Sequence, residues 1–183
     1  MELRPPDPPL HDAEIALRQW SEDDVADLAE ACRDPEIPRW IPFVPSPYAE
    51  EDAREFVAGA TDRWEAAAGA SFAIVDASTG KLLGSIGMGL RPMGTGHIGY
   101  WVAREARGRG VATRALRLLA RWAFEELGLG RVELVTDPAN RASQRVAEKA
   151  CFRREAVLRS ALQYPDGRRA DSVMFSLLPD ELD

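Results

Sequence analysis

One segment of the sequence has the residue types and spacing of an anion-binding site. Gly108 and Gly110 lie between an expected strand that ends at Val102 and an expected helix, so several backbone N–H groups can point into one concavity. The N-terminus of that helix adds about half a positive charge. A pyrophosphate is the natural ligand, although a tight turn before a helix would use the same glycines. The loop has neither the Gly-Lys-Ser/Thr of a Walker A motif nor the third glycine of a Rossmann fingerprint.

Other reactive side chains are few. The chain has two cysteines, Cys32 and Cys151, and two histidines, His11 and His97. They form no disulfide framework and no cluster with metal-ligand spacing, so no metal is expected. A histidine-based triad has no support either, because His11 lies in a proline-rich leader. Metal-dependent hydrolysis and Ser-His chemistry are therefore excluded, and both cysteines are expected to be small buried hydrophobes.

A second block with chemical potential follows the next expected strand. Residues 140–143 (Asn-Arg-Ala-Ser) begin a short expected helix, and residues 147–152 (Ala-Glu-Lys-Ala-Cys-Phe) end it. Together with residues 99–102 (Gly-Tyr-Trp-Val) and 107–112 (Arg-Gly-Arg-Gly-Val-Ala), this block resembles the GNAT superfamily of N-acetyltransferases. It is most similar to the RimJ/RimL group, which acetylates the N-termini of ribosomal proteins. The resemblance extends over nearly all of residues 13–182.

The resemblance implies a role for each part of these blocks. The N–H groups of residues 107–113 would hold the pyrophosphate of acetyl-CoA, and Trp101 and Val102 would flank its pantetheine arm. Asn140 would hydrogen-bond that arm, although Asn is also a common helix N-cap. Ser143 would be the catalytic proton donor to the leaving thiolate, although Ser is also common in a first helical turn. The cofactor-binding residues so implied are Trp101, Val102, Arg107, Gly108, Arg109, Gly110, Val111, Ala112, Thr113, Asn140 and Ser143.

One residue departs from the family pattern. Cys151 stands where the family usually has a glycine, directly before Phe152. A glycine at such a position normally has a positive φ or a close contact, and a cysteine makes both costly. We therefore expect the preceding helix to end differently.

The base that deprotonates the acceptor is not evident from the sequence. At pH 7, deprotonating a lysine of pKa ~10.4 costs about 4.6 kcal/mol, whereas an α-amine of pKa ~7.8 costs only about 1.1 kcal/mol. An α-amine therefore needs little help, and a nearby carboxylate or a water chain would suffice. Some relatives use a glutamate shortly after the sixth strand, but residues 160–164 contain no acid. Glu155 and Asp171 are close in sequence, yet either could simply pair with local arginines.

The charge of the chain is unevenly distributed. Residues 1–68 have a balance of −11 and residues 69–183 a balance of +4, which gives a net charge of −7. The acidic part suits a cationic acceptor and the basic part an anionic ligand, although solvated helix faces would look the same. Overall acidity disfavours nucleic acid as a partner. No apolar run approaches the ~20 residues of a membrane span, and no signal peptide is evident, so a cytoplasmic protein is expected.

The elements that must position these residues fit one α/β (α+β) domain of 183 residues, with residues 1–12 as a loosely ordered leader. Periodicity predicts the order β α α β β β α β α β β. The resemblance implies a mixed, largely antiparallel sheet of about seven strands with about four helices, splayed between strands 4 and 5. Strands are expected at 15–20, 71–76, 81–90, 97–102, 131–136, 152–158 and 171–178, and helices at 21–34, 46–64, 108–127 and 140–150.

Two irregular aromatic segments lie outside the cofactor half. Residues 35–47 contain five prolines, too many for a helix or an inner strand, and predict a rigid loop. A late hairpin turns near Tyr164. The acceptor is expected to enter between them, which makes Trp40, Tyr48 and Tyr164 the predicted substrate-binding residues.

Acetyl transfer from acetyl-CoA to a primary amine is the leading hypothesis. Direct attack in a ternary complex is expected, because no acyl-enzyme nucleophile is evident. The acceptor could be a peptide N-terminus, a polyamine, an amino acid or an antibiotic. Alternatives are a CoA-binding or sensing module without activity on the same fold, and a nucleic-acid binder that uses the arginines of residues 104–121. A homodimer is among the assemblies that the resemblance allows.

Overall fold

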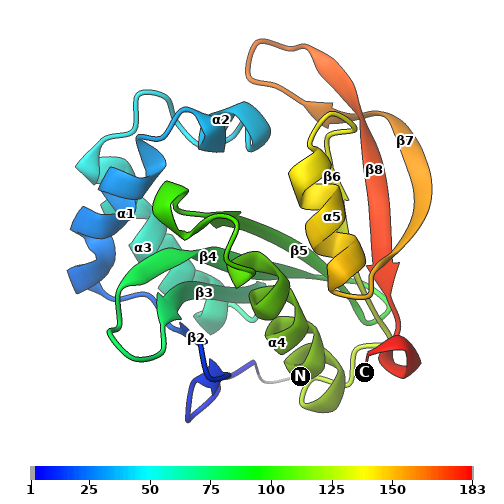
Figure 1. Ribbon diagram of the computed structural model, residues 1–183, viewed down its shortest axis with the longest axis horizontal. Coiled ribbons are helices and arrows are strands. Elements are labelled where there is room, and N and C mark those ends of the chain that lie inside the picture. Colours follow the sequence, from blue (N-terminus) through cyan, green and yellow to red (C-terminus); the bar gives the residue numbers. More distant parts are fainter. Residues whose placement is uncertain (1–2, 183) are drawn as a thin grey trace.

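The computed structural model describes residues 3–182 and arranges them around one mixed sheet (Figure 1). The strands lie side by side in the order β1-β2-β3-β4-β5-β6-β8-β7. Among these described strands, only the pair β5 and β6 is parallel. The strands are Leu10–His11 (β1), Ile15–Arg18 (β2), Gly69–Asp76 (β3), Leu82–Arg91 (β4), Thr95–Val102 (β5), Arg131–Thr136 (β6), Arg153–Gln163 (β7) and Arg169–Leu177 (β8).

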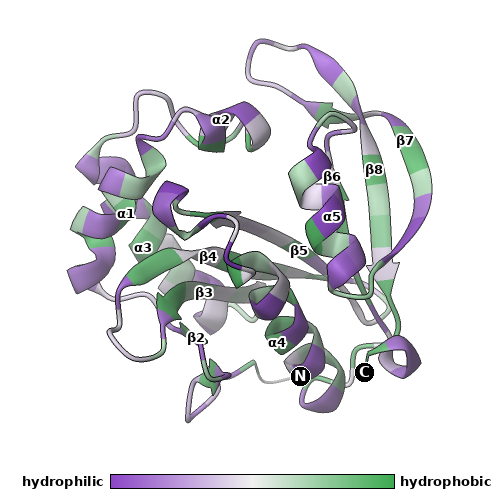
Figure 2. Cartoon of the chain, viewed as in Figure 1, coloured by the Kyte–Doolittle hydropathy of each residue, from purple (hydrophilic) through white to green (hydrophobic). Residues whose placement is uncertain are grey.

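Helices cover both faces of the sheet. Strand β3 explains why, since its side chains alternate between two hydrophobic clusters. Phe72 and Ile74 belong to the cluster that contains α4, whereas Ala73 and Val75 belong to the cluster under α1 and α3. Figure 2 shows the hydrophilic outer surfaces of these helices. The helices are Val25–Cys32 (α1), Glu36–Trp40 (α2), Glu50–Glu65 (α3), Val111–Glu125 (α4) and Arg141–Lys149 (α5).

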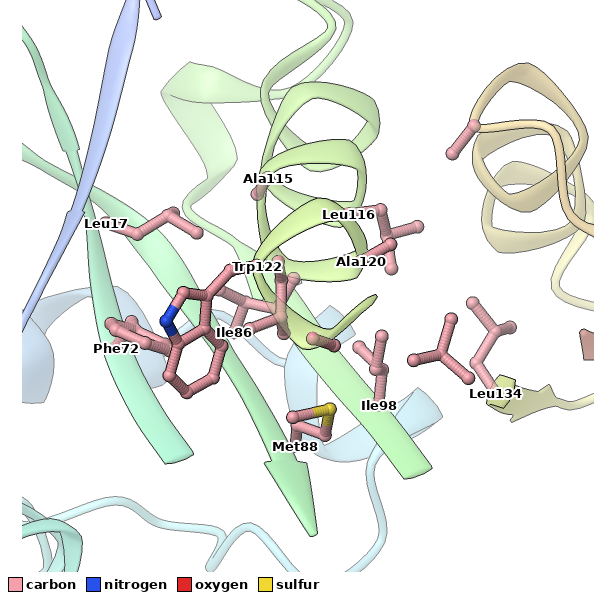
Figure 3. Close-up of a cluster of buried hydrophobic side chains, with 14 of the residues drawn as sticks. Leu17, Phe72, Ile86, Met88, Ile98, Ala115, Leu116, Ala120, Trp122 and Leu134 are labelled. Atoms are coloured by element: carbon pink, nitrogen blue, oxygen red, sulfur yellow. The ribbon is translucent and has the colours of Figure 1, made fainter. Parts of the chain in front are cut away.

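The larger core holds α4 against the sheet. Along α4, apolar side chains recur at helical spacing, so one stripe faces inward. Figure 3 shows Leu116 and Trp122 of this stripe in one cluster with Ile86, Ile98 and Leu134, which come from three different strands. Each fully buried side chain of this size contributes roughly 1.5–3 kcal/mol. This packing fixes the N-terminus of α4 relative to the end of β5.

The sheet opens where its two parallel strands part. The register of β5 and β6 runs from Thr95 opposite Arg131 to His97 opposite Glu133. On its other side β5 stays paired with β4 as far as Val102. A splay was expected between the fourth and fifth predicted strands. These two strands are β5 and β6 in the structure, since β1 was not among the strands expected from the sequence.

Two expectations about the region before β3 are wrong. Residues 36–40 form the helix α2 although Pro38 lies within it. Pro38 is the third residue of that helix, where the N–H would have no partner within the helix. The helix α3 does not begin at Ser46 and Pro47 but after Ala49, whose N–H donates to Asp52 Oδ2 at 2.7 Å.

The expected counts of strands and helices need small corrections. The structure has eight strands and five α-helices within the described residues, because β1 and α2 are added. The leader is more ordered than expected over its described part: Leu3 is buried and β1 pairs with β2. Residues 1 and 2 of the leader lie outside the described residues. Over residues 3–182, none of the helices has the length and apolar character to cross a bilayer.

The end of α5 also differs from expectation. Cys151 has a φ of +70° and so adopts the conformation that glycine would take. Its N–H donates to Glu148 O at 3.1 Å, and the N–H of Phe152 donates to Ala147 O at 3.0 Å. This is the Schellman pattern of a normal helix end. The helix therefore ends in the usual way, and the cysteine bears the backbone strain.

Candidate active site

A cleft of about 1050 Å³ lies where β5 and β6 part. Its lining comes from both halves of the chain: from α2 and α3 on one side, and from the ends of β5 and β6, the start of α4 and one face of α5 on the other. Two predicted residues, Arg109 and Tyr164, are not part of this lining. The predicted residues that the cleft brings together are Trp40, Tyr48, Trp101, Val102, Arg107, Gly108, Gly110, Val111, Ala112, Thr113, Asn140 and Ser143.

The glycine loop has the backbone geometry of an anion site. Gly108 and Gly110 have φ values of +76° and +82°, which other residues adopt only with strain. The first hydrogen bond of α4 runs from the Arg114 N–H to Gly110 O at 3.1 Å. The N–H groups of the three residues between them therefore have no partner within the helix. All three residues line the cleft, at a helix N-terminus where the helix dipole favours negative charge.

The basic side chains near this loop differ from those expected. Arg107 Nη2 lies 2.7 Å from Asp34 Oδ2, and Arg107 Nε donates to Val102 O at 3.0 Å. Arg107 thus connects the segment after α1 to the end of β5, and its charge is already paired. Two further basic side chains of the cleft lining, Arg145 and Lys149, lie one turn apart on α5. In the sequence, their spacing of four residues on a predicted helix was the signal that could have placed both on one helix face.

Ser143 is held by two hydrogen bonds at the start of α5. Its N–H donates to Asn140 Oδ1 at 3.0 Å, so Asn140 is the N-cap of the helix. The Ser143 hydroxyl lies 2.9 Å from the hydroxyl of Tyr100 on β5, and either oxygen can be the donor. Burial raises the pKa of Tyr100 to about 12, which keeps its hydroxyl protonated at neutral pH. The sequence prediction missed Tyr100, although it adjoins Trp101 in the motif of residues 99–102.

Two of the predicted substrate-binding residues have structural contacts of their own. Tyr48 is buried among residues of α1 and α3, and only part of it reaches the cleft. Beside it, burial raises the pKa of the Cys32 thiol to about 12, so this thiol is not a nucleophile. Tyr164 lies outside the lining, but its hydroxyl donates to Asp137 Oδ2 at 3.2 Å, and Asp137 lines the cleft.

Charges of both signs line the cleft. On the wall formed by α2 and α3 lie the acids Glu36, Asp52 and Glu55 together with Arg63. On the other side, α5 contributes Arg145 and Lys149, and the turn before it contributes Asp137. The wall formed by α2 and α3 is therefore acidic on balance, which favours a cation there.

Neither carboxylate considered as a base lies in the cleft lining. Glu155 is held by Arg131, whose Nη1 and Nη2 lie 2.9 Å and 2.5 Å from its two oxygens. These hydrogen bonds, with another from Ser176, lower the pKa of Glu155 to about 2. Asp171 accepts the N–H of Ser160 at 2.9 Å. Both side chains thus hold β7 against β8, Glu155 through Ser176 and Asp171 through Ser160.

Comparisons with known proteins agree with this geometry. Residues 14–153 match the family described as the acetyltransferase (GNAT) domain. The "uncharacterized N-acetyltransferase p20" of Bacillus licheniformis is 28% identical over 174 residues, which are 94% of this chain and 97% of that protein. RimJ of Mycobacterium smegmatis, solved in complex with CoA-disulfide, shares the fold with a TM-score of 0.82 at 24% identity, over 92% of this chain and 83% of that one. The ribosomal-protein-S5-alanine acetyltransferase of Vibrio fischeri does so with a TM-score of 0.81 at 20% identity, over 96% and 98%. The chain therefore belongs to the GNAT family of acetyltransferases, and the predicted enzyme class, an acetyl-CoA-dependent N-acetyltransferase, is confirmed.

Proposed function

We propose that this chain transfers the acetyl group of acetyl-CoA to the N-terminal α-amine of a protein. The observation that carries the proposal is one cleft that combines an anion-binding loop with the hydrogen-bonded pair of Tyr100 and Ser143. The same cleft has carboxylates in its lining that can attract a cationic acceptor. An enzyme acting on ribosomal proteins would work in the cytoplasm, which is the location we propose.

Acetyl-CoA is the cofactor, and it supplies an activated acetyl thioester. The residues present fit it. The N–H groups of Val111, Ala112 and Thr113 lie ahead of the first hydrogen bond of α4 and are free to bind the pyrophosphate. Arg145 and Lys149 of α5 add positive charge to the lining of the same cleft. The RimJ structure that shares this fold contains CoA-disulfide, which supports the assignment.

The Ser143 hydroxyl is the proton donor to the departing sulfur in this proposal. Asn140 and Tyr100 fix its position, one through the backbone of Ser143 and the other through the hydroxyl. Because the pKa of Tyr100 is about 12, Tyr100 can keep donating a hydrogen bond to the serine oxygen while the serine proton is used. General acid catalysis of this kind contributes typically about 10²–10⁴-fold to the rate.

Three arguments favour an α-amine as the acceptor. Deprotonating it at pH 7 costs only about 1.1 kcal/mol, against about 4.6 kcal/mol for a lysine side chain. Neither Glu155 nor Asp171 lines the cleft as a strong base for a lysine. The S5-alanine acetyltransferase that shares this fold acts, by its name, on an alanine of a ribosomal protein.

An acetylation screen tests the proposal. Hexapeptides that begin with Ser or Ala, a lysine peptide with a blocked N-terminus, spermidine and an aminoglycoside are each incubated with acetyl-CoA. Release of free CoA is followed with a thiol reagent, and products are identified by mass spectrometry. We expect the free α-amine peptides to react fastest at pH 7. Faster acetylation of the lysine or the small amines would contradict the proposed acceptor, and CoA binding without any turnover would indicate a sensing module.

A further inference from the structure

The turn after β6 places a carboxylate beside the predicted proton donor. Asp137 follows β6 directly, and its carbonyl oxygen accepts the N–H of Asn140 at 2.9 Å. Asn140 in turn caps α5 by accepting the N–H of Ser143. Gln144 closes the same turn by donating to Pro138 O at 2.8 Å. Asp137 and Ser143 are therefore parts of one rigid unit, and both line the cleft.

Both oxygens of Asp137 are held in place, but its charge is not neutralised. Oδ1 accepts the N–H of Ala139 at 2.7 Å, and Oδ2 accepts the hydroxyl of Tyr164 at 3.2 Å. Both donors are neutral. Arg168 stacks on the ring of Tyr164, 3.6 Å from its centroid, yet within residues 3–182 no basic side chain forms an ion pair with Asp137. A carboxylate has about four acceptor positions, so two remain for a cation in the cleft.

Two of the other carboxylates that line the cleft already have partners. Glu36 accepts from Arg39 at 3.0 Å and from the indole of Trp40 at 3.3 Å. Asp52 accepts the N–H of Ala49 at the start of α3. These two, with Glu55, lie on the wall formed by α2 and α3. Asp137 alone among the four lies on the turn that also carries Ser143.

We propose that Asp137 binds the acceptor amine as its ammonium ion, so that the nitrogen is held next to the site of acetyl transfer. This inference rests on the proposed function. An ammonium has three donors, and a charge-assisted hydrogen bond to a carboxylate is about twice as strong as a neutral one. Tyr164 orients the carboxylate, which gives the predicted substrate-binding residue an indirect role. The late hairpin then acts on the acceptor through Asp137.

The variant Asp137→Asn isolates the charge. The Asn side chain keeps an oxygen that can accept the Ala139 N–H, so the turn is preserved while the carboxylate is lost. Asp171→Asn is the matched control, because Asp171 also accepts a backbone N–H but does not line the cleft. The probes are a hexapeptide that begins with Ser and the same peptide with an acetylated N-terminus.

Binding of the two peptides to each protein is measured by calorimetry, together with kcat/KM for the free peptide and the affinity for CoA. We expect the wild type and Asp171→Asn to bind the free peptide more tightly than the acetylated one. In Asp137→Asn that preference should vanish, and kcat/KM should fall about 10-fold or more, the value for one charge-assisted bond, with CoA affinity unchanged. Tyr164→Phe removes only the hydroxyl that orients the carboxylate, so it should lower kcat/KM less than Asp137→Asn does.

Three outcomes would overturn the inference. One is equal binding of the free and acetylated peptides by the wild type, and the second is an Asp137→Asn variant that behaves like Asp171→Asn. The third is an equal loss of CoA affinity, which would show that the turn had collapsed. If the wild type acetylates no peptide, the proposed function fails, but the binding comparison still decides whether Asp137 recognises the ammonium.

Discussion

Replacing Gly110 with aspartate tests the anion site at its centre. Gly110 has a φ of +82°, and a Cβ built there would meet nothing within 4 Å, so a side chain fits without a clash. The backbone strain of a non-glycine residue is roughly 1–2 kcal/mol. Gly110→Asn has the same size and a similar strain but no charge. The ratio of CoA affinities between the Asp and Asn variants therefore isolates the electrostatic effect.

The size of this effect follows from Coulomb's law. A carboxylate about 5 Å from one phosphate charge is unfavourable by about 0.8 kcal/mol at the dielectric constant of water and by about 3.3 kcal/mol at an effective constant of 20. The loop is exposed at Gly110, so the result should lie between these limits. We expect the Asp variant to bind CoA roughly 10- to 100-fold more weakly than the Asn variant, which corresponds to about 1.4–2.8 kcal/mol.

Isothermal titration calorimetry with CoA measures both affinities, and thermal unfolding checks that both variants fold. The difference between the variants should shrink as salt is added, because the Debye length falls from ~10 Å at 0.1 M to ~3 Å at 1 M. Equal CoA affinity of folded Gly110→Asp and Gly110→Asn would refute the assignment of the pyrophosphate to this loop. A difference that persists at 1 M salt would show that the effect is not electrostatic.

Three further variants test other parts of the structure. Ser143→Ala should lower turnover, measured by CoA release, by roughly 10-fold or more while CoA affinity stays unchanged. Equal turnover would show that Ser143 has only a structural role in the first turn of α5. Cys151→Gly should raise the free energy of unfolding in urea by about 1 kcal/mol, because it removes the strain of a left-handed residue; a loss of stability would show that the thiol packing matters more. Glu155→Gln removes the pair with Arg131, an exposed contact worth at most about 1 kcal/mol. Because the pKa of Glu155 is lowered to about 2, the stability it adds is complete above its ordinary pKa near 4.5 and is lost as the pH falls toward 2. The difference in unfolding free energy between wild type and Glu155→Gln should therefore shrink over that range, and a constant difference would contradict the pairing.

Local patterns in the sequence predicted most of the fold. The apolar spacing of α4 and the alternation of Ile15 and Leu17 with Ala16 and Arg18 in β2 were enough to identify both elements, because each buries one stripe or one face. The helix α2 was missed because proline content was counted without regard to position. Pro38 lies in the first turn of α2, where a missing N–H costs little.

The backbone features of the site were also predictable, whereas several side-chain partners were not. The positions of Gly108 and Gly110 predicted a loop whose backbone N–H groups point into one concavity, and both glycines have the positive φ values that such a loop can use. The pairing of Arg107 with Asp34 joins residues that lie far apart in the sequence, and no local pattern encodes such a contact. The same holds for Tyr100 with Ser143 and for Tyr164 with Asp137, since each pair forms only when the strands are assembled.

The parting of β5 from β6 leaves two strand edges inside the sheet. Beyond His97 and Glu133 the peptide groups of these strands have no register with each other. Exposed strand edges are templates for pairing with other chains and hence for aggregation. A ligand that fills the cleft shields these edges and, by binding only the folded chain, also raises its stability through mass action. The cellular supply of the cofactor thus bears on how long the protein survives as well as on its rate of turnover, and a shortage would expose the chain to aggregation and proteolysis.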